Sequence, residues 1–92
     1  MAITVLFTPH SMNATQYDEI VRQLESIGAT TPQGRLYHTC FGTGDALRVF
    51  DVWQSLEDFQ AFGPTLMPIL QRVGVDPGQP DIAPLHHSIP PV

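Results

Sequence analysis

Residues 49–62 run VFDVWQSLEDFQAF, and this stretch decides the fold of the chain. Its first part, Val49–Trp53, is rich in β-branched and aromatic residues and predicts a strand. Ser55 then begins a helix-capping pattern, and the acidic Glu57 and Asp58 stand in the first turn, where the helix dipole favours negative charge. The stretch therefore predicts a strand that passes directly into a helix.

The helix after this strand is long and interrupted. Apolar residues continue at helical spacing from Phe59 to Val73, and Gly74 is a natural stop. Gly63-Pro64 and Pro68 interrupt the pattern, which predicts a helix that is kinked or split into two short pieces.

The rest of the chain contains the same kinds of segment. Ile3–Phe7 and Arg35–Phe41 predict strands, and apolar residues at helical spacing from Tyr17 to Ile27 predict a helix between them. A proline-rich segment, Ile82–Ile89, predicts a final strand at an edge of the sheet. The first helix has two alternative capping patterns: Asn13 with Gln16, and Thr15 with Asp18.

The predicted order is β-α-β-β-α-β, with the third strand running from Ala46 to Trp53. This order is typical of the α+β ferredoxin-like fold, a four-stranded antiparallel sheet with two helices on one face. A chain of 92 residues fits one domain, residues 1–92. The second face of such a sheet needs a cover.

The hairpin predicted over residues 35–53 has two apolar faces. Its turn is either Thr43-Gly44 or Gly44-Asp45, and both choices place His38 with the odd-numbered residues of the next strand. One face carries Leu36, His38, Cys40, Leu47, Val49, Asp51 and Trp53, and the other carries Tyr37, Thr39, Phe41, Arg48, Phe50 and Val52. Two apolar faces fit helices on one side and a second copy of the sheet on the other. We therefore expect a homodimer.

On the face that carries His38, the side chains of His38 and Asp51 are the candidates for acid–base catalysis. The Gly44-Asp45 turn places them directly opposite each other, and the other turn places them on a diagonal within reach. A carboxylate beside an imidazole selects its tautomer, which prepares a general base, although such a pair also occurs as a purely structural contact. The expected pocket wall around them consists of Leu36, Cys40, Val49, Trp53, Phe59 and Phe62.

The remaining titratable candidates are His10, just past the first strand, and the adjacent His86 and His87. Adjacent strand residues point to opposite faces, so only one of that pair can enter a given pocket. No spacing typical of metal ligands is present, and a single Cys40 allows no intrachain disulfide. We expect no metal site, and Cys40 is interpreted as a small packed hydrophobe.

The amino-acid composition restricts the classes of binding partner and of reaction. The formal net charge is -5, and four arginines are the only lysine or arginine residues in the chain. Without lysine, Schiff-base chemistry on that side chain is excluded, and so few cations argue against binding nucleic acid or an acidic membrane. No apolar run approaches the roughly 20 residues of a membrane span, and no signal peptide is recognisable. We expect a cytoplasmic protein.

The stretch 49–62 also resembles a known family. A strand ending in Trp53, a serine cap, an acidic turn and the pair Phe59 and Phe62 is similar to the dimeric α/β-barrel superfamily. Within it, the similarity is to the small antibiotic biosynthesis monooxygenase-like proteins. The resemblance implies a homodimeric barrel made of two facing sheets, with a pocket between each sheet and its own helices. It also implies that Trp53 lines this pocket.

The resemblance implies a set of reactions. The superfamily includes cofactor-free oxygenases of polyketide quinols, lactone isomerases and polyketide cyclases, and the histidine bases of the cyclases correspond in position to His10 and His86. We therefore expect a cofactor-independent enzyme for an apolar or aromatic, polyketide- or quinol-like metabolite. In it, His38 oriented by Asp51 takes a proton. A cyclase, isomerase or lyase, and a non-catalytic ligand-binding dimer, are the alternatives.

Overall fold

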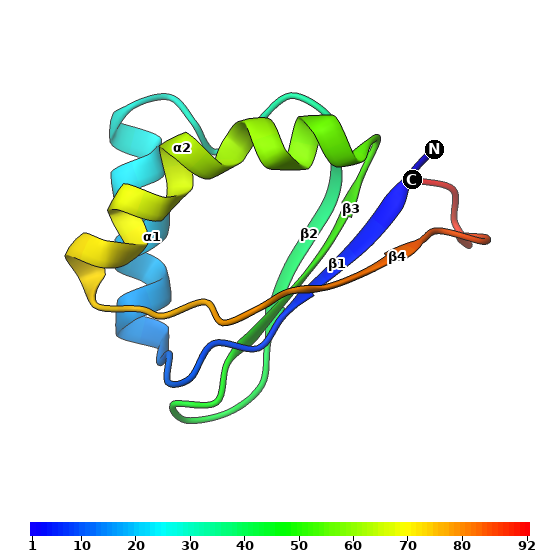
Figure 1. Ribbon diagram of the computed structural model, residues 1–92. Coiled ribbons are helices and arrows are strands. Elements are labelled where there is room, and N and C mark those ends of the chain that lie inside the picture. Colours follow the sequence, from blue (N-terminus) through cyan, green and yellow to red (C-terminus); the bar gives the residue numbers. More distant parts are fainter.

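The elements of the structure follow the predicted order along the chain. The computed structural model describes residues 1–92, with β1 (Ile3–Phe7), α1 (Ala14–Ser26), β2 (Arg35–Phe41), β3 (Arg48–Trp53), α2 (Leu56–Val73) and β4 (Asp81–Pro84). The strands form one antiparallel sheet in the order β2-β3-β1-β4, and both helices lie on one face of it (Figure 1). The predicted ferredoxin-like fold is confirmed.

The β2–β3 hairpin has the register that places His38 directly opposite Asp51. This is the register of the Gly44-Asp45 turn, but the connection is a longer loop over residues 42–47. The segment before α1 pairs with this loop. The Met12 N–H donates to the Asp45 carbonyl at 2.8 Å, and the Leu47 N–H donates to the Met12 carbonyl at 3.1 Å.

A β-bulge interrupts the pairing at the start of β2. Arg35 pairs with Trp53 and Tyr37 pairs with Val52, so Leu36 is left as the extra residue. Arg35 therefore takes the helix-side position that regular alternation assigns to Leu36, and Leu36 is 42% exposed. The prediction that Leu36 shares the face of His38 is wrong for this reason.

The helix caps agree with the sequence patterns. Asn13 and Gln16 form a reciprocal capping box at the start of α1, so the first of the two alternatives is the one observed. At the start of α2, the Ser55 hydroxyl accepts the Asp58 N–H at 3.1 Å. α2 ends at Gly74, whose φ of 82° lies in the left-handed region that glycine tolerates best.

α2 is one continuous helix, so of the two predicted alternatives, kinked or split, the kinked helix is the one observed. Pro64 and Pro68 lie inside it, and the helix changes direction along its length (Figure 1). Each proline removes one backbone donor and therefore weakens the helix locally. Phe62, Ile69 and Leu70 are buried on one side of the helix, and the burial of this face stabilises it across both prolines.

β4 is shorter than predicted. It covers Asp81–Pro84 instead of Ile82–Ile89, although the Leu85 N–H still donates to the Ala2 carbonyl at 2.9 Å. Pro84 lies opposite Ile3, the first residue of β1, so the chain beyond it passes the end of its partner strand. β4 does lie at an edge of the sheet, as its prolines predict.

The core lies between the sheet and the helices. Val5, Trp53 and Ile69 are its most completely buried large side chains. No helix covers the other face of the sheet (Figure 1), where Tyr37 and Phe41 are 47% and 37% exposed. Neither helix is both long enough and apolar enough to span a membrane.

Candidate active site

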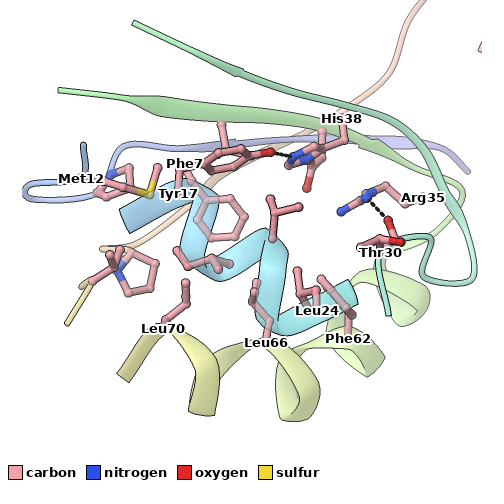
Figure 2. Close-up of a pocket in the computed structure, with 17 residues that line it drawn as sticks. Phe7, Met12, Tyr17, Leu24, Thr30, Arg35, His38, Phe62, Leu66 and Leu70 are labelled. Atoms are coloured by element: carbon pink, nitrogen blue, oxygen red, sulfur yellow. Dashed lines mark hydrogen bonds and ion pairs between the residues drawn. The ribbon is translucent and has the colours of Figure 1, made fainter. Parts of the chain in front are cut away.

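A cavity of about 240 Å³ lies between the sheet and the two helices. Most of its wall is apolar, and α1, α2 and β1 supply the side chains of Ile20, Val21, Leu24, Phe62, Leu66, Leu70 and Phe7. The polar residues in its lining are Tyr17, Thr30, Arg35, His38 and Asp51. Tyr17, His38 and Arg35 lie along the side of the cavity next to the sheet (Figure 2). The cavity is therefore an apolar space with one wall that can do acid–base chemistry.

A chain of hydrogen bonds links side chains of α1, β2 and β3. The Tyr17 hydroxyl lies 2.6 Å from Nε2 of His38, and Nδ1 of His38 lies 2.6 Å from Oδ1 of Asp51. The second oxygen of Asp51, Oδ2, accepts the Trp53 indole N–H at 3.2 Å. Asp51 is 5% exposed, so this carboxylate is held in the core by two donors.

This network assigns the proton on the imidazole. Ionised Asp51 can only accept hydrogen bonds, so Nδ1 of His38 must be the protonated nitrogen. Nε2 of neutral His38 then carries a lone pair, and the Tyr17 hydroxyl donates to it. The side of His38 that faces Tyr17 is therefore the basic side.

Burial raises the pKa of the Tyr17 hydroxyl above its usual value. The negative fields of Cys40, Asp51 and Asp18 raise it further, and only Arg35 opposes them. Tyr17 accordingly stays a neutral hydroxyl, which can donate one proton while it accepts another. It is suited to passing protons and unsuited to remaining ionised.

Arg35 enters the same side of the cavity because of the β-bulge. Its position opposite Trp53 puts it on the helix side of the sheet, and one of its N–H groups donates to the Thr30 carbonyl at 2.6 Å. No carboxylate lies within ion-pair distance of its guanidinium. It is the only lysine or arginine among the lining residues.

The predicted pocket wall is only partly the observed one. Val49 and Phe62 line the cavity, but Trp53 and Phe59 do not. Trp53 is 1% exposed and packs edge-on against Phe59, with 5.6 Å between ring centroids. Trp53 is thus a core residue behind the wall, and its contact with the site is the hydrogen bond to Asp51.

Four other predicted residues lie outside the cavity lining. Leu36 is turned away by the bulge, and half-buried Cys40 packs against the core, where burial raises the pKa of its thiol. His10 is exposed, 3.6 Å from the carboxylate of Asp76, and His86 is exposed on the C-terminal segment. Of the four catalytic candidates, the structure brings together His38 and Asp51. No group of three or more His, Cys, Asp or Glu side chains is placed to hold a metal ion.

Sequence reasoning missed Tyr17 and Arg35. Tyr17 stands in an apolar helical stripe, which predicts a core position; the available signal was its hydroxyl, because a buried tyrosine usually needs a hydrogen-bond partner. Arg35 is the first residue of its predicted strand, and regular alternation of side chains along that strand places it on the face opposite His38. No local pattern in the sequence marks the bulge that reverses this.

Comparisons with known proteins give a likeness in structure. No protein-family model and no curated protein sequence matches the chain. A candidate antibiotic biosynthesis monooxygenase from Chloroflexus aurantiacus J-10-fl aligns over 96% of each chain with a TM-score of 0.68 and 14% identity. SnoaB, a cofactor-independent oxygenase from Streptomyces nogalater, aligns over 98% of this chain and 96% of its own, with a TM-score of 0.62 and 16% identity.

A third neighbour gives the same result. A candidate antibiotic biosynthesis monooxygenase from Deinococcus radiodurans aligns over 96% of this chain and 93% of its own, with a TM-score of 0.55 and 14% identity. Likeness at such low identity concerns the path of the backbone, since function depends on the side chains of the site. The chain has the ferredoxin-like fold of the antibiotic biosynthesis monooxygenase-like proteins.

Proposed function

We propose that this protein is a cofactor-independent enzyme that removes a proton from the hydroxyl group of a small aromatic or largely apolar molecule. The observation that carries the proposal is the chain Tyr17–His38–Asp51, which belongs to the wall of an otherwise apolar cavity. A base needs a lone pair, a partner that balances its positive charge, and contact with the substrate. His38 has the first two, and Tyr17 supplies the third.

The proton passes through Tyr17. A substrate hydroxyl donates its proton to the Tyr17 oxygen while the Tyr17 proton passes along the 2.6 Å hydrogen bond to Nε2 of His38. The resulting imidazolium is balanced by Asp51 at Nδ1. Because Tyr17 gives up one proton as it gains another, it never has to exist as the phenolate that its burial disfavours.

Molecular oxygen is the co-reactant that the monooxygenase-like fold suggests. For a phenol with a free para C–H, oxygen adds to the para carbon of the phenolate, and the imidazolium returns a proton to give a hydroperoxide. Loss of water from this hydroperoxide leaves a quinone, so phenol plus oxygen gives quinone plus water. The likeness to SnoaB supports this course. Cyclisation, isomerisation and elimination begin with the same removal of a proton.

The test uses 1-naphthol, whose two fused rings suit a cavity larger than the roughly 150 Å³ that holds benzene. In complex with the protein, its naphtholate absorption band should appear about 1–3 pH units lower than in water, because a positive imidazolium forms beside it. Formation of one 1,4-naphthoquinone per oxygen consumed would identify the reaction as oxygenation. Bound 1-naphthol that titrates as it does in water would contradict the proposed function and favour a non-catalytic binding protein.

Replacement of Tyr17 by Phe should slow naphtholate formation by about 10- to 100-fold, because the hydroxyl that joins substrate to His38 is lost. Stopped-flow absorbance measures this rate. Tyr37→Phe is the matched control, since Tyr37 lies on the far face of the sheet and should react at the wild-type rate. A Tyr17→Phe protein as fast as wild type would mean that substrate reaches His38 directly.

A second copy of the chain is our proposed cover for the open face of the sheet. Tyr37 packs on Phe50 with 6.5 Å between ring centroids, and the Arg48 guanidinium lies 4.9 Å from the centroid of Phe41. Aromatic residues in such numbers on one exposed face are typical of protein interfaces. The same face is the one that the apolar pattern of the hairpin assigns to a partner.

Light scattering at micromolar concentration should therefore give about twice the monomer mass of 10.2 kDa. Tyr37→Glu should convert this species to a monomer, because it buries an unpaired carboxylate in the interface. The exposed substitution Gln60→Glu changes the charge equally and should leave the dimer intact. A wild-type mass of 10.2 kDa would refute the dimer.

A further inference from the structure

Arg35 is a cation without an anionic partner in the wall of an apolar cavity. The chain has four arginines and no lysine. The other three are engaged elsewhere: Arg22 with Glu19, Arg72 with Gln23, and Arg48 over the ring of Phe41. The recorded contact of Arg35 is a single hydrogen bond to the Thr30 carbonyl, so most of its five N–H donors are free.

The position of Arg35 results from the backbone and does not follow from simple strand alternation. The bulge at Leu36 turns Arg35 onto the side of the sheet that bears His38 (Figure 2). Arg35 pairs with Trp53 on β3, and His38 pairs with Asp51, two residues away. The Cα atoms of Arg35 and His38 are therefore about 7 Å apart along the sheet. The two side chains therefore enter the cavity wall at separate points along the sheet.

A half-buried guanidinium facing apolar side chains is poorly solvated, and an anion in the cavity would offset this cost. A carboxylate fits best, because the planar guanidinium can donate two parallel hydrogen bonds to its two oxygens. We propose that Arg35 binds a carboxylate of the substrate and that the substrate is an aromatic hydroxy acid. This inference rests on the proposed function, which supplies the hydroxyl at the Tyr17–His38 end.

The spacing of the two groups restricts the substrate further. Because Arg35 and His38 are separated along β2, the carboxylate and the reacting hydroxyl lie on different parts of the ring. An ortho arrangement would join the two groups by an internal hydrogen bond and withhold the hydroxyl from Tyr17. A meta or more distant arrangement leaves both free to bind the protein.

The test compares 4-hydroxy-2-naphthoate with its neutral amide, 4-hydroxy-2-naphthamide, by isothermal titration calorimetry. Wild-type protein should bind the carboxylate about 10- to 100-fold more tightly than the amide, as charged hydrogen bonds require. Arg35→Gln should reduce this preference to nearly one, because the charged donor that distinguishes the carboxylate from the amide is lost. Arg35→Lys should keep part of the preference, because it retains the charge and loses the paired geometry.

Equal affinities in the wild type, or a preference that survives in Arg35→Gln, would overturn the role of Arg35. The naphtholate band of the amide complex reports separately on proton removal. If it shifts while the two affinities are equal, the inference about Arg35 fails and the proposed function stands. If the carboxylate preference is present without a shifted band, the proposed function fails and anion binding remains. Absence of binding by both probes would contradict both.

Discussion

Replacement of His38 by Gln is expected to lower the rate of 1-naphthol turnover by about 10²- to 10⁴-fold. The amide of Gln can accept the Tyr17 hydroxyl and donate to Asp51, so it preserves both hydrogen bonds that His38 makes. An amide cannot hold the additional proton that an imidazole holds. The substitution therefore removes the base and keeps the contacts around it.

The measurements are the naphtholate band, the rate of quinone formation and the affinity for 1-naphthol. The band and the rate should collapse in His38→Gln, while the affinity stays within about threefold because the apolar wall is unchanged. His87→Gln is the matched control, since His87 is exposed and lies outside the cavity lining. A His38→Gln protein that retains wild-type turnover would eliminate His38 as the base.

Replacement of Asp51 by Asn should have an effect of similar size for a different reason. Asp51 accepts two hydrogen bonds, from Nδ1–H of His38 and from the Trp53 indole. The Asn side chain has one acceptor, its oxygen, and one donor group, its NH₂. Because the indole N–H of Trp53 can only donate, the Asn oxygen faces Trp53. The Asn donor then faces Nδ1, which forces the proton of His38 to Nε2. A histidine protonated at Nε2 cannot accept the proton from Tyr17.

Nitrogen NMR of the imidazole tests this tautomer exchange directly. Wild-type His38 should carry its proton on Nδ1, and Asp51→Asn should carry it on Nε2, together with a turnover loss of about 10²- to 10⁴-fold. The unfolding midpoint should change little, because the Trp53 indole keeps its acceptor, Nδ1 accepts from the new amide, and the Tyr17 oxygen accepts from Nε2–H. Observation of the Nε2–H form in the wild type would overturn the proton assignment, and with it the relay through Tyr17.

The candidate site was partly predictable from local sequence. His38 and Asp51 follow from strand alternation and a short turn, and their pairing at 2.6 Å agrees with the register of one predicted turn. Trp53 was placed in the same layer, but a side chain that is 1% exposed supports the site from behind. Strand alternation defines the side of the sheet on which a side chain lies. It does not determine whether that side chain lines the cavity or is buried behind the cavity wall.

Tyr17 was harder to predict because its partner comes from another element. α1 and β2 are separated in sequence, and the contact between Tyr17 and His38 depends on how the helix crosses the sheet. Helical periodicity places Tyr17 on the inward side, and it says nothing about which strand residue lies beneath its hydroxyl. The role of Tyr17 as a donor therefore required tertiary structure.

The amino-acid sequence by itself determined the order of the elements, the helix cap at Ser55 and the stop at Gly74. These features depend on residues within a few positions of one another, so local chemistry is sufficient. Tertiary structure decided the continuity of α2, because burial of one helix face outweighs the local effect of two prolines. It also decided the length of β4 and the bulge before Tyr37, since both depend on the neighbouring strand. The acid–base pair is thus a property of one hairpin, whereas the relay and the cationic wall exist only after α1, β2 and β3 have packed together.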